Sequence, residues 1–271
     1  MSTRRTPTNS GVRIEFKEKE GYAIVWIGSE PVNSMTLELW TALSDALGDM
    51  ERDPKVRGVI FASELKKDIF TAGNDIKELY AKTTSKERYV KFWGTQTSFL
   101  CRLLRSPLAT VCAIRGACPA GGCALALCCD YRVQSDTGTF GLNEVQLGIP
   151  VPKYWAKLFC EVAGRTAGDL NLQLGALLTP PEAKGMGLLH EVVPIAAVVP
   201  AAERAMVEKF LKHPDEARGA TKVNMRGDFS AEWEGYIEEE AAGGWAMLST
   251  PEVEKALGGV IARLSKGRAK L

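Results

Sequence analysis

A glycine-rich stretch followed by an apolar segment, from Arg115 to Pro150, constrains the fold of this chain more than any other part. Gly121 and Gly122 lack a Cβ and precede the letters CALALCC, which predict the first turns of a buried helix. The first N–H groups of a helix have no partner within it and lie at the positive end of its dipole. This turn suits an oxygen that gains negative charge, although such glycines also allow tight helix packing.

Two other common sites do not fit the same stretch. The spacing from Gly116 to Gly121 is that of a phosphate-binding loop, but Gly122 and Cys123 stand where that loop requires Lys followed by Ser or Thr. The chain contains no G-x-S-x-G nucleophile elbow. The sequence therefore favours neither a P-loop nucleotide site nor a hydrolase of the nucleophile-elbow type.

Glu144 is the only ionisable residue between Gly138 and Val151. An acid in a loop is usually solvated, and its position alone leaves that interpretation open. Its apolar sequence neighbours favour desolvation, which raises the pKa of a carboxyl group toward the range useful for proton transfer. Glu144 is therefore the candidate general base.

Four motifs, in order along residues 12–195, resemble the crotonase (enoyl-CoA hydratase/isomerase) superfamily, most closely its Δ3,Δ2-enoyl-CoA isomerases. They read PVNSM, FTAGNDIKEL, GACPAGGC and GLNEVQLGIP. The resemblance implies an α/β fold with a crotonase-like ββα-superhelix core over residues 12–195. Residues 1–11 are expected to form a flexible N-terminal tail, and residues 196–271 a C-terminal helical region for oligomerisation that ends in a targeting tripeptide.

The resemblance also implies roles for individual residues. Two backbone N–H groups hold the thioester oxygen in that superfamily, and the motifs place them at Ala72 and Gly121. Glu144 takes the catalytic acid–base position. Contacts with the substrate are expected from the residues that follow Ala72, which are Gly73, Asn74, Asp75 and Ile76. Asp75 and Glu78 also have the spacing of a capping box, which predicts a helix start there.

One departure separates two activities within the superfamily. Hydratases carry a second Glu three residues after the second oxyanion-hole glycine, where this chain has Ala124. A methyl group cannot orient water for addition to a double bond. The resemblance therefore implies an isomerase that converts 3-enoyl-CoA to trans-2-enoyl-CoA in the β-oxidation of unsaturated fatty acids. Dienoyl-CoA isomerisation, hydration and a non-catalytic acyl-CoA-binding or RNA-binding role remain alternatives; Asp130 and Asp136 match no motif.

The amino-acid composition limits the kinds of partner and ligand that the chain can bind. The 271 residues include 34 basic and 33 acidic side chains, so no strong overall field favours nucleic acid or a membrane surface. No apolar run reaches the roughly 18 residues of a membrane span. Seven cysteines without a C-x-x-C pair and two histidines indicate reduced thiols and no metal site. We expect an acyl-CoA thioester as substrate, no separate cofactor because coenzyme A is part of that substrate, and, from the resemblance, a homotrimer or hexamer.

The chain ends carry address signals. Ala269-Lys270-Leu271 resembles the S-K-L peroxisomal signal with Ala in place of Ser. Residues 1–12 are polar and basic, which is a weak presequence pattern. We expect a peroxisome-type organelle, with the mitochondrial matrix as the alternative.

The periodicity along the chain predicts strands alternating with helices. Strands are expected at 13–16 and 22–27, a helix beginning after Thr36, and a strand at 56–62. Residues 76–104 are expected to be helical, followed by a strand at 107–114. Further short strands and helices lead to a helical C-terminal part. This alternation predicts a parallel sheet with crossover helices.

Overall fold

The computed structural model describes residues 5–6 and 11–268. Within them, one seven-stranded sheet has the order β1-β2-β3-β4-β5-β7-β9, and β6 pairs with β8 in a separate two-stranded sheet. The strands are β1 (Arg5–Thr6), β2 (Val12–Lys17), β3 (Tyr22–Ile27), β4 (Gly58–Ser63), β5 (Ala109–Ile114), β6 (Cys118–Pro119), β7 (Tyr131–Ser135), β8 (Phe140–Gly141) and β9 (Glu191–Val193). From β3 to β9 every pairing is parallel, as the alternation of elements predicts.

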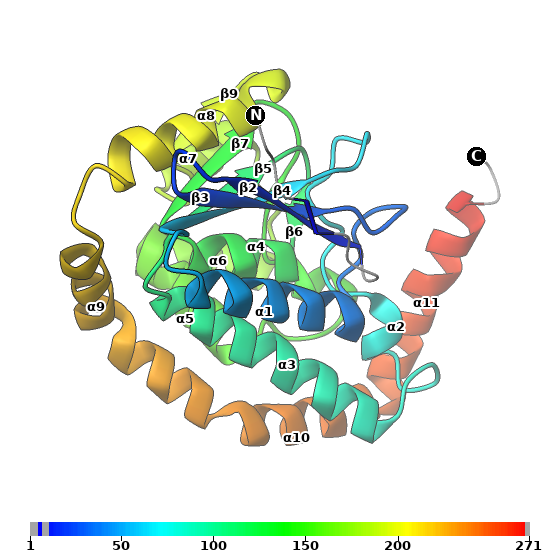
Figure 1. Cartoon of the computed structure of the whole chain (residues 1–271). Helices are drawn as coiled ribbons and strands as arrows, with labels where there is room; N and C mark the ends of the chain where they lie inside the picture. Colours follow the sequence, from blue (N-terminus) through cyan, green and yellow to red (C-terminus); the bar gives the residue numbers. More distant parts are fainter. Residues whose placement is uncertain (1–4, 7–10, 269–271) are drawn as a thin grey trace.

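The helices surround this sheet (Figure 1). They are α1 (Leu37–Arg52), α2 (Ile76–Leu79), α3 (Lys86–Arg105), α4 (Gly121–Cys128), α5 (Lys153–Ala163), α6 (Arg165–Leu174), α7 (Pro180–Gly185), α8 (Val198–Ala205), α9 (Asp215–Gly235), α10 (Ile237–Leu248) and α11 (Pro251–Arg268). The turns η1 (Glu144–Leu147) and η2 (Ile195–Ala197) are 3-10 helices, and η3 (Met206–Phe210) is a π-helix. The predicted α/β class is confirmed.

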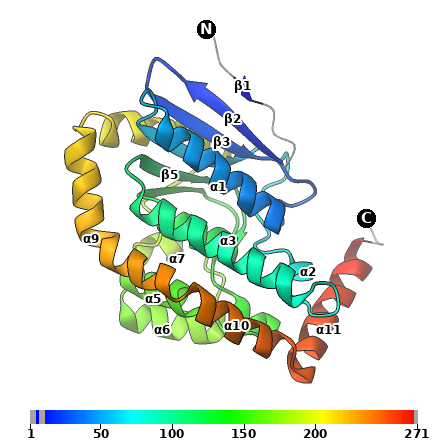
Figure 2. The same ribbon diagram turned by 60° about the horizontal axis from the view of Figure 1, so that its bottom comes forward.

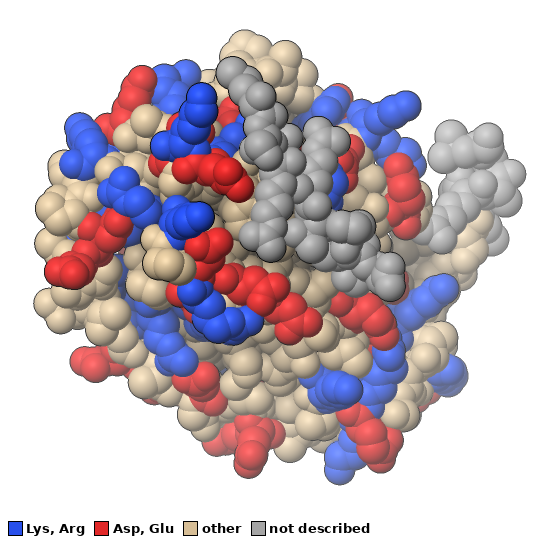
Figure 3. All heavy atoms as spheres, viewed as in Figure 1, with Lys and Arg blue, Asp and Glu red and all other residues tan. Residues whose placement is uncertain are grey.

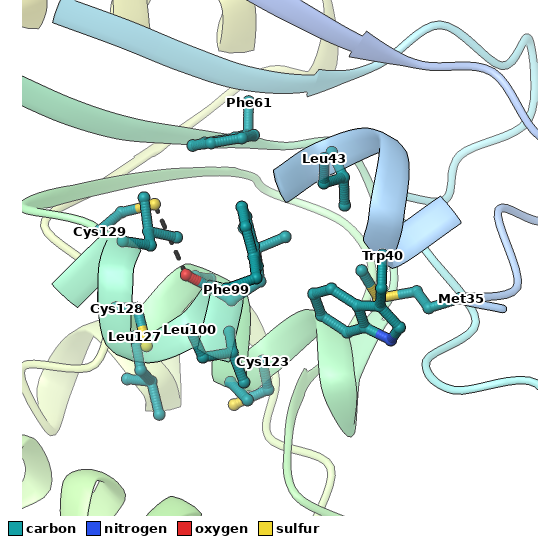
Figure 4. Close-up of a cluster of buried hydrophobic side chains, with 14 of the residues drawn as sticks. Met35, Trp40, Leu43, Phe61, Phe99, Leu100, Cys123, Leu127, Cys128 and Cys129 are labelled. Atoms are coloured by element: carbon teal, nitrogen blue, oxygen red, sulfur yellow. Dashed lines mark hydrogen bonds between the residues drawn. The ribbon is translucent and has the colours of Figure 1, made fainter. Parts of the chain in front are cut away.

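Helices cover both faces of the sheet, which explains the continuous apolar runs of its central strands. Every residue of β4 and β5 is buried. Successive residues of β4 face opposite sides, so Ile60 packs with α8 while Phe61 packs with α1 and α3. Figure 4 shows Phe61 close to Phe99, whose ring centroid lies 5.6 Å from that of Trp40. The core therefore has two layers, one on each side of the sheet.

The region predicted to follow the core, residues 196–271, contributes to both layers. Ala201 and Met206, of α8 and η3, share a buried cluster with the strands of the sheet. Helices α9 and α10 pack along α3 (Figure 2), and Trp233, Ala241 and Leu257 of α9 to α11 belong to the other buried cluster. The division at residue 195 stays a prediction.

The predicted N-terminal tail is described only in part. Most of the tail predicted over residues 1–11 lies outside them. Arg5 and Thr6 pair with β2 as the short strand β1, which the sequence analysis did not predict. The tripeptide Ala269-Lys270-Leu271 also lies outside the described residues.

The segment 76–104, which was expected to be helical, contains two helices separated by a break. The hydroxyl of Thr83 donates to the carbonyl oxygens of Lys77 and Tyr80, at 2.9 and 3.0 Å. These bonds take carbonyl groups that a continuing helix would use. Ser85 then caps α3 by accepting from the N–H of Arg88. Helix α5 was not predicted from the sequence.

Buried charges attach α9 to the core. The ammonium group of Lys222 lies 2.7 Å from Asp130 Oδ2, and Arg226 lies 2.9 Å from Oδ1 of the same carboxylate. Lys222 is only 6% exposed, so this pair is held away from water. On the molecular face of Figure 3, by contrast, acidic and basic side chains are interspersed. No helix among the described residues is long and apolar enough to cross a membrane.

The buried amide of Asn33 joins β3, β4 and the segment that leads to Ala72. Its Oδ1 accepts from the N–H of Ser29, and its Nδ2 donates to Ile27 O, Ser63 Oγ and Phe70 O. The backbone of Asn33 has a φ of 51°, a left-handed conformation that Asn tolerates better than most residues. One side chain therefore fixes the loop that carries the first predicted oxyanion donor.

Asn33→Ala should lower the free energy of unfolding by about 3 kcal/mol, because it leaves several buried polar groups unpaired. Urea unfolding measures this change. Asn33→Gly is the matched control, since it removes the same hydrogen bonds while keeping the left-handed backbone favourable. A loss below about 1 kcal/mol in Asn33→Ala would contradict the proposed role of this amide.

Candidate active site

The small sheet β6-β8 brings the glycine-rich helix start and Glu144 together. Cys118 pairs with Phe140 and Pro119 with Gly141 in parallel register. The N–H of Ala120 then donates to Gly141 O at 2.9 Å. Because α4 begins directly after β6 and η1 begins soon after β8, both segments leave the same edge of this sheet.

The first turn of α4 presents free N–H groups. The first bond of this helix runs from Ala124 N to Ala120 O, and no described residue accepts the N–H of Gly121. Ala120, just before the helix, has a φ of 51° and a ψ of −122°, a strained conformation for a residue with a Cβ. The predicted donor at Gly121 is therefore free, at the positive end of a buried apolar helix.

The N–H of Ala72 is not free, which disagrees with the prediction for this residue. It donates to Val32 O at 2.9 Å. The next two N–H groups differ from each other, because that of Gly73 donates to Thr71 Oγ1 whereas that of Asn74 has no acceptor among the described residues. The open donor of this loop is therefore two residues further along, at Asn74.

The two loops touch at glycines. Gly73 has a φ of +84°, and a Cβ built on it would lie 2.9 Å from that of Ala120. A Cβ on Gly121 would lie 2.7 Å from Asn74 Oδ1. That oxygen accepts a hydrogen bond from the indole N–H of buried Trp40 at 3.1 Å. The absence of side chains at both glycines thus lets the N–H groups of Asn74 and Gly121 approach one another.

The carboxyl group of Glu144 is buried without a partner. The residue is 4% exposed, and neither Oε1 nor Oε2 has a hydrogen-bond partner among the described residues. Desolvation raises the pKa of Glu144 to about 7. The solvated-loop interpretation of Glu144 is wrong, since the carboxyl group does not point into bulk water.

A cavity of about 920 Å³ connects these parts. Five of the predicted site residues line it, namely Ala72, Asn74, Asp75, Ile76 and Glu144. Gly73 and Gly121 are not among its lining residues, although Ala120, next to Gly121, is. The cavity lies at the upper end of the usual size for small-molecule sites.

The capping box predicted for Asp75 and Glu78 is only half formed. Its Oδ1 accepts from the N–H of Lys77 at 2.9 Å and so caps α2. Glu78 does not complete the capping box, because its carboxylate accepts from the N–H of Leu37 and from Arg88. Glu78 instead ties α2 to α1 and α3, which steadies the loop that carries Asn74.

Several residues of the cavity were not foreseen from the sequence. Trp155 and Asn143 line it, as do a face of α10 and the end of α11. Its cationic lining residues are Lys77, Lys153 and Arg263. Only the helical periodicity of α10 and α11 could have signalled these walls, and it does not identify which face meets a cavity.

The chemistry available in the cavity is therefore proton transfer beside an anion-stabilising pair of N–H groups. Among the described residues, no group of three or more His, Cys, Asp and Glu side chains could hold a metal ion. The cysteines are free thiols, and Cys123, Cys128 and Cys129 lie among apolar side chains (Figure 4). Burial raises the pKa of the Cys123 thiol well above its ordinary value.

The sheet order, the open start of α4 and the buried acid beside it are those of a crotonase fold. The family profile described as enoyl-CoA hydratase/isomerase matches residues 19–263. The chain therefore belongs to the enoyl-CoA hydratase/isomerase family, as the motifs indicate.

Individual members of this family show which proteins the chain is similar to. The chain is 40% identical to "Enoyl-CoA delta isomerase 1, mitochondrial" of Mus musculus over 80% of its own length and 75% of that protein. It is 36% identical to the Homo sapiens protein of the same name, over 94% and 84% of the two chains. The crystal structure of human mitochondrial delta3-delta2-enoyl-CoA isomerase has a TM-score of 0.91 at 34% identity, covering 95% of this chain and 99% of that one. An enoyl-CoA hydratase from Bacillus halodurans, at 22% identity, shares the fold with a TM-score of 0.83 over 92% of this chain and all of that one.

The raised pKa of Glu144 predicts how the free energy of unfolding depends on pH. Its folded value of about 7 exceeds its ordinary value of 4.5, so between these pH values the folded protein keeps a proton that the unfolded chain releases. The free energy of unfolding should therefore fall as pH rises through this window, by about 3 kcal/mol from this group. Glu144→Gln lacks the titration, so its stability relative to the wild type should rise by that amount between pH 4 and pH 8.

Urea unfolding of both proteins at the two pH values measures this difference, because other titrating groups are common to both. Glu239→Gln, at another acid that lines the cavity, is the control for the substitution itself. An equal stability difference for Glu144→Gln at pH 4 and pH 8 would mean that the acid titrates normally.

Proposed function

We propose that this protein is a Δ3,Δ2-enoyl-CoA isomerase that converts 3-enoyl-CoA to trans-2-enoyl-CoA. The unpaired, buried carboxyl group of Glu144 in one cavity with two free N–H donors carries this proposal. The names of the mouse and human relatives support the same activity. The substrate would be an acyl-CoA thioester, with coenzyme A as part of it and no separate cofactor.

In the proposed mechanism the thioester oxygen lies between the N–H groups of Asn74 and Gly121. Asn74 replaces Ala72 in this role because the N–H of Ala72 already donates to Val32. As the carboxylate, Glu144 removes a proton from C2, and the two donors stabilise the dienolate oxygen. The same carboxyl group returns the proton to C4. One such donor contributes about 2.7–4 kcal/mol to the transition state, and a positioned base about 10²–10⁴-fold in rate.

Desolvation of Glu144 suits both proton transfers. A group with a pKa of about 7 is substantially ionised near neutral pH and yet holds a proton well enough to return it. No described residue forms an ion pair with the Glu144 carboxylate. The carboxylate is therefore not stabilised by a neighbouring cation, and it can take a proton from the substrate and return it. An ordinary surface carboxylate would be a weaker base by roughly two to three pKa values.

Hydration and dienoyl-CoA isomerisation are less well supported. Ala124, where hydratases have their second acid, is a buried methyl group on α4. Asp130 is held between Lys222 and Arg226, and Asp136 is exposed and does not line the cavity. Neither aspartate therefore provides a second acid in the cavity, which supports the one-base isomerase over these two alternatives.

Two further proposals concern assembly and location. Leu170 and Leu174 on α6 are each 61% exposed, and α6 packs against η1 beside the site. Such an exposed apolar face supports a homotrimer or hexamer. The relatives are named mitochondrial, which supports the matrix as location; the peroxisome-type address of Ala269-Lys270-Leu271 stays a prediction.

Glu144→Gln should lower kcat for 3-enoyl-CoA by at least about 10²-fold while acyl-CoA binding is retained, because the amide keeps the size but not the basicity of the acid. Growth of ultraviolet absorbance from the conjugated enoyl thioester measures turnover. Glu239→Gln, which lines the same cavity, should keep near wild-type activity. Equal turnover by wild type and Glu144→Gln would remove Glu144 from the mechanism.

The pH dependence tests the same base independently. The carboxylate is the active form, so kcat/KM should rise about tenfold per pH unit below the pKa of Glu144, which is about 7, and level off above it. Initial rates at substrate concentrations far below KM, from pH 5 to pH 9, give this profile. A plateau that already begins near pH 5 would be inconsistent with a desolvated base.

A further inference from the structure

One face of α10 lines the catalytic cavity, and the middle of that face is made of glycine. The lining residues recur with helical spacing; they are Tyr236, Glu239, Glu240, Gly243, Gly244, Met247 and Leu248. Helix α10 lies along α3, with α11 leading away from its end (Figure 2). Two adjacent glycines therefore form a notch in an otherwise bulky wall.

The two glycines have different surroundings. A Cβ on Gly244 would collide with the hydroxyl of Tyr89 on α3, so Gly244 makes room for a neighbouring side chain. A Cβ on Gly243 would meet no atom within 4 Å. Glycine inside a helix is unfavourable relative to alanine, and no contact of the protein itself requires it at position 243. Gly243 is exposed and lines the cavity, so the open space beside it lies on the solvent-facing side of the cavity.

The facing wall is rigid. Trp93 stacks between Tyr89 and Trp155, with ring centroids 5.8 and 6.0 Å apart. The indole N–H of Trp93 donates to Glu240 Oε2 at 3.1 Å, and Glu240 Oε1 accepts from the N–H of Lys153. These contacts hold the aromatic rings in place. A side chain at position 243 would project into the open space beside α10, on the solvent-facing side of the cavity.

The part of the cavity between these rings and α10 suits hydrocarbon better than phosphate. It is lined by Tyr89, Trp93, Trp155, Met247 and Leu248, and the acids Glu239 and Glu240 on the same face of α10 disfavour a phosphate there. The ammonium group of Lys153 already lies over the ring of Tyr236, 4.0 Å from its centroid. The other cations of the cavity, Lys77 and Arg263, belong to α2 and α11. An apolar chain gains most by leaving water in such surroundings.

We propose that Gly243 keeps open the part of the cavity that takes the distal carbons of the acyl chain, so that position 243 sets the longest chain accepted. This inference rests on the proposed isomerase function and names its substrates as long-chain 3-enoyl-CoA thioesters. Each methylene buried contributes roughly fourfold to affinity, so excluding three or four of them has a large effect.

Gly243→Leu tests the proposal. A leucine fits the open space without meeting protein atoms and improves helix propensity, so the variant should fold. We expect kcat/KM to fall on the order of 100-fold for 3-hexadecenoyl-CoA and to stay within about twofold for 3-hexenoyl-CoA. Gly243→Ala should give a smaller loss confined to the longest chains.

Gly259→Leu is the matched control. Gly259 also lies inside a helix, α11, and a Cβ there would meet nothing within 4 Å, but Gly259 does not line the cavity. It makes the same change in helix propensity and should leave the chain-length profile unchanged. Thermal unfolding of both variants by circular dichroism checks that each is folded.

Two results would overturn the proposal. A loss of the same size at every chain length would place residue 243 against the coenzyme A portion, which all the substrates share. Unchanged kcat/KM for long chains would place the distal carbons elsewhere. Binding of saturated acyl-CoA thioesters of the same lengths, by calorimetry, separates this inference from the proposed function. If the wild type shows no turnover, the proposed isomerase function is wrong. If Gly243→Leu binds long saturated acyl-CoA thioesters more weakly but short ones as well as the wild type does, the proposed role of Gly243 is still supported.

Discussion

The site depends on one costly feature, a carboxyl group buried without a partner. Burial takes the carboxyl group of Glu144 out of bulk water, and no described residue pairs a cation with it, so its pKa is raised. The rest of the structure has to hold this acid where it is. Pairing of β6 with β8 and the bond from Ala120 N to Gly141 O fix the segment from which η1 begins. The buried acid can then meet a substrate in place of solvent.

The oxyanion donors depend on the close approach of two loops far apart in sequence. Asn33 and Thr71 fix the first loop by hydrogen bonds, and β6 leads directly into the second. Gly73 and Gly121 allow contact because any side chain at either position would meet the other loop. The other hydrogen bonds of the fold decide which N–H groups stay free. The N–H of Ala72 donates to the carbonyl oxygen of Val32, whereas the N–H of Asn74 has no acceptor among the described residues.

The same separation of roles holds for the cavity. Its reactive end is built by the α/β core, whereas its far wall comes from α10 and α11. Ala241, Leu248 and Leu257 anchor these two helices in the main core, whereas a Cβ on Gly243 would meet no protein atom within 4 Å. In the proposed role of Gly243, the reacting groups and the chain-length range are therefore set by different elements.

The sequence by itself determined the elements and the chemical groups. Apolar periodicity specified β3, α1, β4 and β5, because burial of alternate or helical faces is a local property of residue order. The motifs identified Glu144 and Gly121, since an isolated acid and adjacent glycines are visible in the letters. Tertiary structure alone decided the rest. Whether Ala72 or Asn74 offers a free N–H depends on an acceptor at Val32, and the break after α2 depends on side-chain bonds made by Thr83. The face of α10 that meets the cavity, like the desolvation of Glu144, exists only once distant segments pack, and neighbours in the sequence do not encode it.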